Sequence, residues 1–291
     1  MATMKVIKKR ISSVNNTRKI MKAMDLVATS KLQKARLRFD DFLPMCENIK
    51  LVMEGVKASI GGEGEGEEEV EFAESRDVKS IAYVVLTSDR GLCGGFNVNI
   101  SKEALAFINA NEGKDAKIIA VGSKGADYFR RRGKQVVFKY AGASESAVFE
   151  SAELIGDRVT AMYKSGEVDE VYLIYSHFES VLAHSPRMEK LLPIMADPDN
   201  GDDAGNIDMK YDPDVGTFIS YAVPMYINIT VFGAMLESAL CEYSSRMTSM
   251  DSATRNATDL IDDLTLEYNR VRQGLITQEI TEIVSGANAL K

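Results

Sequence analysis

A glycine-rich stretch, TSDRGLCGGFN at residues 87–97, holds the densest set of residue types suited to chemistry. It lies between a β-rich run and a helical pattern, where an open parallel sheet presents a helix N-terminus to a phosphate. The stretch has neither the GxGxxG nor the GxxxxGK[ST] pattern, and no acidic ribose partner is evident about twenty residues further on. We therefore interpret it as a tight turn whose glycines allow positive φ or close backbone approach, with nucleotide binding as the alternative.

Other residue types that commonly act in catalysis are dispersed. His177 and His184 have no cysteine-containing or acidic motif at ligand spacing, so we interpret both as hydrogen-bonded residues of a loop. The three cysteines include no CxxC pair, which predicts neither a zinc site nor a disulfide framework. Cys93 near Arg90 has the setting of a mildly activated thiol, although a small buried residue in a turn is commoner. The sequence predicts no catalytic residue, cofactor or metal.

The element that must organise these residues is the C-terminal end of the chain. No proline occurs between Met225 and Leu290, and apolar or small residues recur there at alternating spacings of four and three. This heptad seam predicts a left-handed coiled coil. We expect a short helical approach over 215–223, bent at Pro224, before the long helix. The seam positions are Leu240, Tyr243, Met247, Met250, Thr254, Ala257, Ile261, Leu264, Tyr268, Val271 and Leu275.

The first sixty residues supply a partner helix, which we expect Pro44 to kink or interrupt. Each fully buried Leu, Ile or Met contributes about 1.5–3 kcal/mol, whereas isolated helices are marginal, so pairing of the two ends dominates. If the intervening segment is one compact domain, the two helices run antiparallel. The seam is apolar except at Arg18 and Asp25. It comprises Ile11, Val14, Arg18, Met21, Asp25, Ala28, Leu32, Ala35, Phe39, Phe42, Cys46, Ile49, Met53, Val56 and Ile60.

Between these helices, β-rich runs alternate with helical patterns. The runs are 80–88, 117–122, 135–139 and 170–178, with a final short strand in 187–192, and the helices are 99–109, 124–132 and 144–164. This alternation predicts a mostly parallel sheet covered on both faces. The predicted fold class is α/β, with a Rossmann-like domain inserted into a long antiparallel coiled coil. We expect a coil helix at 1–60, an acidic linker at 61–77, the α/β domain at 78–195, an acidic loop at 196–214 and the second coil helix at 215–291.

Charge is segregated along the chain, whose formal net charge is −8. Residues 1–40 hold eleven Lys or Arg against Asp25 and Asp40, while 61–77 and 197–214 are acidic. The basic helix face is interpreted either as a solvated surface or as a docking stripe for an acidic protein surface. Nucleic acid is the weakest option, because the chain is acidic overall and no aromatic residues interleave these lysines. No apolar run reaches the length needed to span a bilayer.

Three blocks resemble the gamma subunit of the F-type ATP synthase, bacterial type, almost residue for residue. They are RISSVNNTRKIMKAMDLVATSKLQKA at 10–35, TSDRGLCGGFN at 87–97 and RMTSMDSATRNATDLIDDLTLEYNRVRQGLITQEITEIVSG at 246–286, and the likeness extends over essentially the whole chain. The resemblance implies a non-catalytic rotor shaft, one copy per complex, inside three alpha and three beta subunits. Its base would rest, with the epsilon subunit, on the membrane ring of c subunits, through which proton flow drives rotation and ATP synthesis.

The resemblance also implies contact residues. Met24 with Arg18 and Lys22 matches the segment that faces the acidic loop of beta, and Arg90 and Cys93 match the turn that approaches the beta C-terminal region. Polar positions implicated in shaft contacts and coupling are matched by Arg246, Gln273, Thr277, Glu279 and Glu282.

The end of the C-terminal helix stands apart from the seam. After Leu275 its apolar residues change phase, and an antiparallel first helix has no residues left to pair with them. An exposed apolar helix face requires something to enclose it, unless this end is a frayed tail. The resemblance implies a sleeve of alpha and beta subunits around Ile276, Ile280, Ile283 and Leu290.

The sequence departs from the family pattern at two places. Gly274 stands where a small alanine is usual, which loosens the helix by about 1 kcal/mol. The glutamate-rich linker after Ile60 is not part of the pattern. The absence of a transit peptide favours the cytoplasmic face of a bacterial inner membrane. Two rival interpretations are an α/β nucleotide-binding enzyme with a helical dimerisation arm and a coiled-coil adaptor that forms homodimers.

Overall fold

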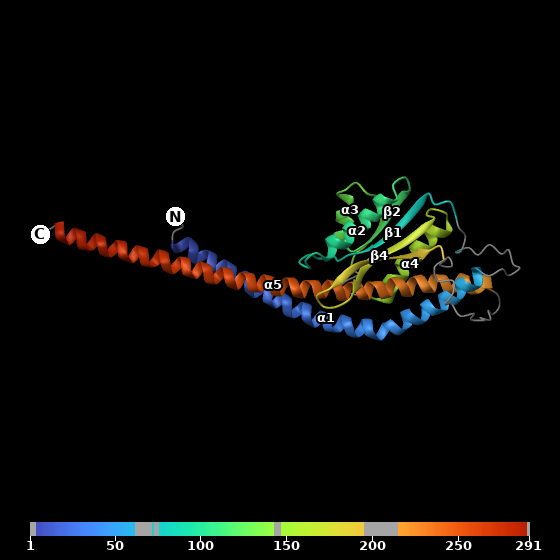
Figure 1. Cartoon of the computed structure of the whole chain (residues 1–291), viewed down its shortest axis with the longest axis horizontal. Coiled ribbons are helices and arrows are strands. Elements are labelled where there is room, and N and C mark those ends of the chain that lie inside the picture. The colour runs from blue at the N-terminus through green and yellow to red at the C-terminus, as the bar shows by residue number, and fades with distance from the viewer. Residues whose placement is uncertain (1–3, 62–71, 73–75, 143–146, 195–214, 290–291) are drawn as a thin grey trace. The chain divides into compact units, whose positions relative to one another are not determined.

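The computed structural model describes residues 4–61, 72, 76–142, 147–194 and 215–289. Long helices at the two ends of the chain frame a β-α alternation, as predicted (Figure 1). The helices are α1 (Met4–Gly61), α2 (Phe96–Ala110), α3 (Ser123–Arg130), α4 (Phe149–Lys164) and α5 (Val215–Ala289). The strands are β1 (Ser80–Leu86), β2 (Asp115–Val121), β3 (Val136–Tyr140), β4 (Glu170–Phe178) and β5 (His184–Leu192).

The five strands form one sheet in the order β3-β2-β1-β4-β5. All neighbouring pairs are parallel except β4 and β5, so the predicted mostly parallel sheet is confirmed. The last strand begins at His184, earlier than the predicted 187, because the hairpin pairs from Phe178 opposite His184. Polar residues and Pro186 hide this start in the sequence, and an edge strand tolerates proline.

Strand β1 sends alternate side chains to two cores. Ala82, Val84 and Leu86 join a cluster with α4 and with parts of α1 and α5, whereas Ile81, Tyr83 and Val85 join α2 and α3. Figure 1 shows α2 and α3 on one side of the sheet and α4 on the other. Burial on both faces explains why the strand is an unbroken apolar run in the sequence.

The chain forms two compact units. The α/β unit comprises Ser30–Ser245, and the helical unit comprises Met1–Thr29 with Arg246–Lys291. Each long helix therefore contributes one part to each unit. Apart from Gly61, Phe72 and residues 76–77, the predicted linker 61–77 lies outside the described residues, as does the whole of the acidic loop 196–214.

In the helical unit the predicted seam is the buried face of both helices. Every seam position from Ile11 to Ala28, and from Met247 to Val271, is buried or half-buried. Leu275, predicted as the last seam position, is instead 42% exposed. The Arg18 guanidinium donates to Thr258 Oγ1 at 3.5 Å, and this register places Met4, the first described residue of α1, opposite Arg272. Leu275 therefore lies beyond the described end of its partner helix.

In the α/β unit α1 and α5 run antiparallel, as predicted. The Lys31 ammonium lies 5.5 Å from the ring centroid of Tyr243, and the rings of Phe42 and Phe232 meet edge to face with centroids 4.8 Å apart. Residue numbers thus rise along one helix as they fall along the other. The seam positions from Leu32 to Val56 are all buried or half-buried, while the side chain of Ile60 lies outside the described residues.

Neither helical proline ends a helix. An interruption of α1 at Pro44, and a separate short helix before Pro224, are both wrong, because α1 and α5 continue through these residues. An interior proline costs about 3 kcal/mol. Several buried apolar residues on either side of each proline outweigh this cost, at about 1.5–3 kcal/mol each. They include Leu32 and Met53 in α1 and Val223 and Tyr226 in α5.

By length and composition alone, α5 is long and apolar enough to cross a membrane. One 18-residue window within Gly216–Asn288 has a mean hydropathy of 1.5, but 72% of that window is buried inside the protein. A helix that packs its apolar residues against a sheet has the same composition.

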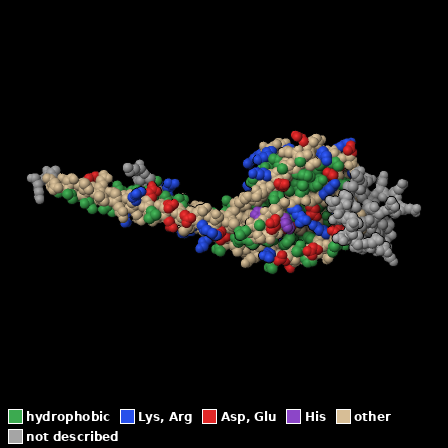
Figure 2. Space-filling view, viewed as in Figure 1, with side chains coloured by type: hydrophobic (Ala, Val, Ile, Leu, Met, Phe, Trp, Pro, Cys, Tyr) green, Lys and Arg blue, Asp and Glu red, His purple; other side chains and the backbone are tan. Residues whose placement is uncertain are grey.

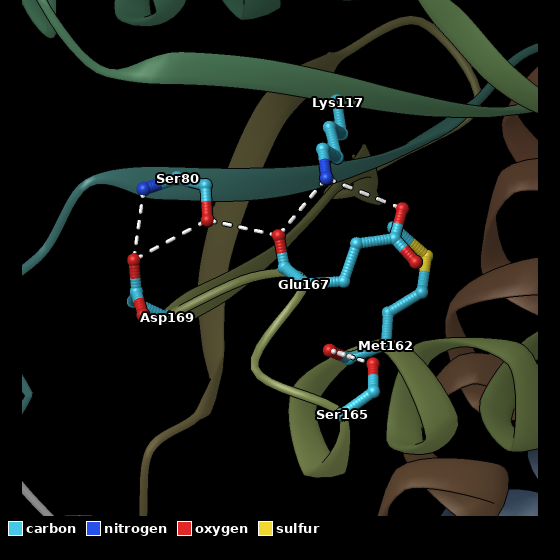
Figure 3. A network of polar contacts seen from close by, with 6 residues as sticks. All are labelled: Ser80, Lys117, Met162, Ser165, Glu167 and Asp169. Carbon is cyan, nitrogen blue, oxygen red and sulfur yellow. Dashed lines mark hydrogen bonds and ion pairs between the residues drawn. The ribbon is translucent and has the colours of Figure 1, made fainter.

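A polar network at the amino ends of the strands fixes β1 beside β2 and β4 (Figure 3). One Asp169 oxygen accepts hydrogen bonds from the backbone N–H groups of Lys79 and Ser80, both at 2.9 Å. The Lys117 ammonium donates to the carbonyl and carboxylate of Glu167 at 3.0 and 3.2 Å. Burial raises the pKa of Asp169, but these hydrogen bonds outweigh it and hold that pKa below its ordinary value.

We expect Gly233→Ala to destabilise the α/β unit by about 1–3 kcal/mol, because overpacking at a close helix contact forces the neighbours apart. A Cβ at this position would lie 2.6 Å from Cys46 Sγ. The measurement is the free energy of unfolding from urea titration.

The double variant Gly233→Ala/Cys46→Ala removes the clashing sulfur, so it should recover part of the loss beyond the sum of the single effects. Gly274→Ala is the matched control, since its Cβ would meet no atom within 4 Å. Strict additivity of the two substitutions would contradict the proposed contact.

Candidate functional site

The glycine-rich turn leaves the carboxyl end of β1 and leads into α2. Strand order reverses between β1 and β4, and open α/β sheets bind ligands at the carboxyl ends of the strands beside such a reversal. Gly94 has φ 55° and Leu92 has φ 64°. The prediction of a tight turn with positive φ is therefore confirmed, although one such residue is a leucine instead of a glycine.

Side chains of the turn bond to one another. Asn97 Oδ1 accepts from the Ser88 backbone N–H at 2.8 Å, and its Nδ2 donates to Cys93 Sγ at 3.2 Å. The Ser88 hydroxyl donates to the Arg90 carbonyl at 2.6 Å. These bonds give the loop a fixed conformation from within.

Asp89 occupies the position that a phosphate would take at the start of α3. Its Oδ1 accepts from the backbone N–H and the hydroxyl of Ser123, both at 2.9 Å, and its Oδ2 accepts from the Gly142 N–H at 2.8 Å. A carboxylate that already uses these donors repels an incoming anion. Next to Thr87, α5 leaves a cavity of only about 10 Å³, lined in part by Glu242. The geometry does not favour a nucleotide here.

The turn presents Arg90 and Leu92 at its surface, and Cys93 is the small buried residue that its commoner interpretation predicted. Arg90 is exposed, as a contact residue requires, but Cys93 is only 2% exposed and its thiol points into the fold. Leu92, which the sequence did not single out, is 61% exposed. A non-glycine residue with positive φ turns its side chain outward here, and no sequence pattern signalled this.

Both histidines are hydrogen-bonded, as predicted, but they lie in strands instead of a loop: His177 is near the end of β4 and His184 begins β5. His177 Nδ1 lies 2.6 Å from Glu237 Oε1, which also accepts from the Phe178 N–H at 3.0 Å. His184 Nε2 lies 3.0 Å from the Ser245 hydroxyl. In the described part of the chain, no group of three or more His, Cys, Asp or Glu has a geometry that could hold a metal ion.

The α1 part of the helical unit brings basic and apolar groups to one surface. Lys22 is exposed, whereas Arg18 and Met24 are half-buried, and Arg18 donates to Asn15 Oδ1 at 3.0 Å. Leu26 and Val27 beside them are exposed, which the seam analysis did not anticipate. These residues offer a mixed basic and apolar surface.

The α5 part of the helical unit holds the remaining predicted contact residues. Arg246 is half-buried, and the others are exposed. Thr277 donates to the Gln273 carbonyl at 2.9 Å, and Gln278 donates to Glu282 at 2.9 Å. The exposed residues of this group are Gln273, Thr277, Glu279 and Glu282.

The apolar residues at the end of α5 are exposed as well. Ile276, Ile280 and Ile283 are 46%, 56% and 71% exposed, and Val284 adjoins them. Leu290 lies outside the described residues. Figure 2 shows hydrophobic side chains on the surface of this end of the chain. In water, such a face is expected to be covered by a partner.

Comparisons with known proteins give one consistent result. A protein-family model described as ATP synthase matches residues 3–290. The ATP synthase gamma chain of Alkaliphilus metalliredigens is 40% identical over 294 residues, covering 99% of each chain. The sodium-ion-specific ATP synthase gamma chain of Acetobacterium woodii is 39% identical over 303 residues, covering 98% of this chain and 97% of the relative. A chain of the cryo-EM structure of the Euglena gracilis mitochondrial ATP synthase aligns with TM-score 0.69 and 18% identity, covering 99% of this chain and 94% of that one.

The stability of the chain should depend on pH through His184. Burial lowers the pKa of His184 below its ordinary value of 6.5, against the opposing effect of the Glu179 carboxylate. A histidine whose pKa is lower in the folded state binds fewer protons when folded, so the free energy of unfolding falls as the pH drops through about 6.5. Between about pH 7.5 and 5.5, we expect the free energy of unfolding of His184→Gln to fall less than that of the wild-type chain. The measurement is urea titration at each pH. If the free energy of unfolding of the two proteins fell equally with pH, His184 would not be the source of the pH dependence.

Proposed function

Because the chain belongs to the ATP synthase gamma chain family, we propose that it is the rotor shaft that couples proton flow through a c-ring to ATP synthesis and hydrolysis at the beta subunits. The family itself was predicted from three sequence blocks and is confirmed. The chain is accordingly a non-catalytic subunit of a membrane-associated ATP synthase complex. Rotation, the coupling ion and the individual contacts form the proposal.

The observation that carries the proposal is the apolar end of α5. Ile276, Ile280 and Ile283 are exposed and follow Arg272. Arg272 lies opposite Met4, the first described residue of α1, so these three residues have no described part of α1 opposite them. We propose that a sleeve of three alpha and three beta subunits encloses these residues together with Leu290. A helix held by surrounding apolar side chains instead of a fixed partner helix is free to turn inside them.

The surface around Met24 supports a second contact. Lys22 is exposed and Arg18 half-buried, so the helix turns that precede Met24 carry positive charge toward a partner. We propose that this segment faces an acidic loop of beta, and that Arg246, Gln273, Thr277, Glu279 and Glu282 contribute to coupling. At the turn, Arg90 and Leu92 rather than the buried Cys93 thiol would meet beta.

Each beta site would then pass through different nucleotide affinities as the asymmetric shaft turns. Coupling of this kind requires contacts that differ between rotor positions, because a partner that binds all states equally shifts none of them. The two helices of the helical unit bear different residues, so their surface has no rotational symmetry.

The proposed complex contains one copy of this chain. The chain and the epsilon subunit would rest on the c-ring at the cytoplasmic face of a bacterial inner membrane. The coupling ion is proposed to be the proton, and the sodium-specific relative from Acetobacterium woodii makes a direct test necessary. ATP-driven uptake into vesicles, measured with and without sodium and with a protonophore, separates the two ions.

The experiment that tests the proposal is capture of tagged chain from its own membranes, followed by native mass and ATPase measurements. We expect a complex with the mass of six large subunits plus this chain, with ATPase activity that the isolated chain lacks. A homodimer without partners would favour the adaptor interpretation instead. ATP binding by the isolated chain at residues 91–95 would favour the enzyme interpretation.

We expect Ile261→Asp to uncouple or disassemble the shaft. Ile261 is a half-buried seam position, so a carboxylate there loses part of the roughly 1.5–3 kcal/mol that a fully buried isoleucine contributes, and places a charge in the apolar seam. The measurement is ATP-driven ion pumping per ATP hydrolysed by the reconstituted complex. Thr265→Asp, an exposed position on the same helix, is the matched control; wild-type pumping in the Ile261 variant would contradict the role of the seam.

We expect Met24→Lys to impair coupling by strengthening contact with the acidic beta loop. An added cation near Lys22 increases attraction to carboxylates, most strongly at low ionic strength. Hydrolysis and pumping are measured on the same vesicles. Met24→Leu keeps the size and neutrality of the side chain and should behave as the wild-type chain. A wild-type ratio of pumping to hydrolysis in Met24→Lys at low salt would refute the contact.

A further inference from the structure

A pocket of about 270 Å³ lies between α1 and α5 within the α/β unit. Its α1 wall carries Lys31, Lys34 and Arg38, and its α5 wall carries Leu236, Ala239 and Tyr243. The lining contains no acidic side chain. None of these residues belongs to the shaft contacts proposed above.

The three cations lie on one face of α1. They are spaced three and four residues apart, which places neighbouring side chains one above the other on a helix. Like charges at this spacing repel one another and destabilise a helix. An anion bound between them would remove that repulsion.

Two of the cations are held in place without being neutralised. Arg38 Nη2 donates to the Ala147 carbonyl at 2.6 Å, and the Lys31 ammonium lies 5.5 Å from the ring centroid of Tyr243. In the described part of the chain, no ion pair involves Lys31, Lys34 or Arg38. Their positive charge therefore remains available to a ligand.

The floor of the pocket is apolar. Leu236, Ala239 and Ala147 are all buried. A cationic rim above such a floor suits a compact anion of high charge, with room on the floor for a small apolar body. The guanidinium fork of Arg38 and the point charges of two lysines match phosphate oxygens better than a single carboxylate.

We infer that this pocket binds a small phosphate-bearing polyanion, whose phosphates contact Lys31, Lys34 and Arg38. Pyrophosphate and the diphosphate of a nucleotide share this chemistry. The inference does not rest on rotation or on the partner subunits, because every residue that it uses lies within the α/β unit.

Titration calorimetry of the full chain with pyrophosphate and, separately, with ADP tests the site. We expect saturable binding that weakens as ionic strength rises. We expect the affinity to fall about tenfold or more in Lys31→Gln/Lys34→Gln/Arg38→Gln, because hydrogen bonds to charged groups contribute more binding energy than neutral ones. Tighter binding of ADP than of pyrophosphate would show that the apolar floor holds part of the nucleoside. Equal affinities would show that only the phosphates are bound.

The matched control is Lys8→Gln/Lys9→Gln/Lys19→Gln, which removes the same charge from exposed positions of α1 in the helical unit. It should retain wild-type affinity. Circular dichroism of both triple variants establishes that each is folded. Absence of saturable binding by the wild-type chain, or equal weakening in the two variants, would overturn the inference.

Discussion

Antiparallel burial of α1 against α5 is the interaction on which the rest of this chain depends. Neither helix would be stable alone in water, and each buries a seam that the other completes. In the α/β unit the same two helices also pack on the sheet, where Met53 of α1 and Ile227 of α5 belong to one core cluster. The pairing therefore joins the ends of the chain and covers one face of the sheet at the same time.

The sheet has the topology of a nucleotide-binding fold, but its crevice serves another purpose. Asp89 caps the start of α3, and α5 fills the space above β1 down to about 10 Å³. Topology alone does not determine function. In this chain the carboxyl end of the sheet holds a rigid turn, which presents Arg90 and Leu92 to the outside. Conformational rigidity, rather than ligand binding, is what the glycine-rich stretch supplies.

Periodicity predicted the fold well because it reports burial directly. Most seam positions and the five strands were placed correctly for that reason, and the family followed from three blocks of sequence. The errors have local causes. Packing along α1 and α5 outweighed the cost of Pro44 and Pro224, and the limited length of α1 left Leu275 exposed. The outward direction of the Leu92 side chain depends on a backbone conformation that residue types do not encode.

Gly274 has a mechanical consequence that follows from its place in α5. It lies just past Arg272, where the described register with α1 ends, and no atom would lie within 4 Å of a Cβ there. A glycine in a helix allows wider backbone fluctuations than alanine. Twist applied along α5 would therefore concentrate at this point instead of spreading evenly. The end of the helix would twist more easily than the part that is paired with α1.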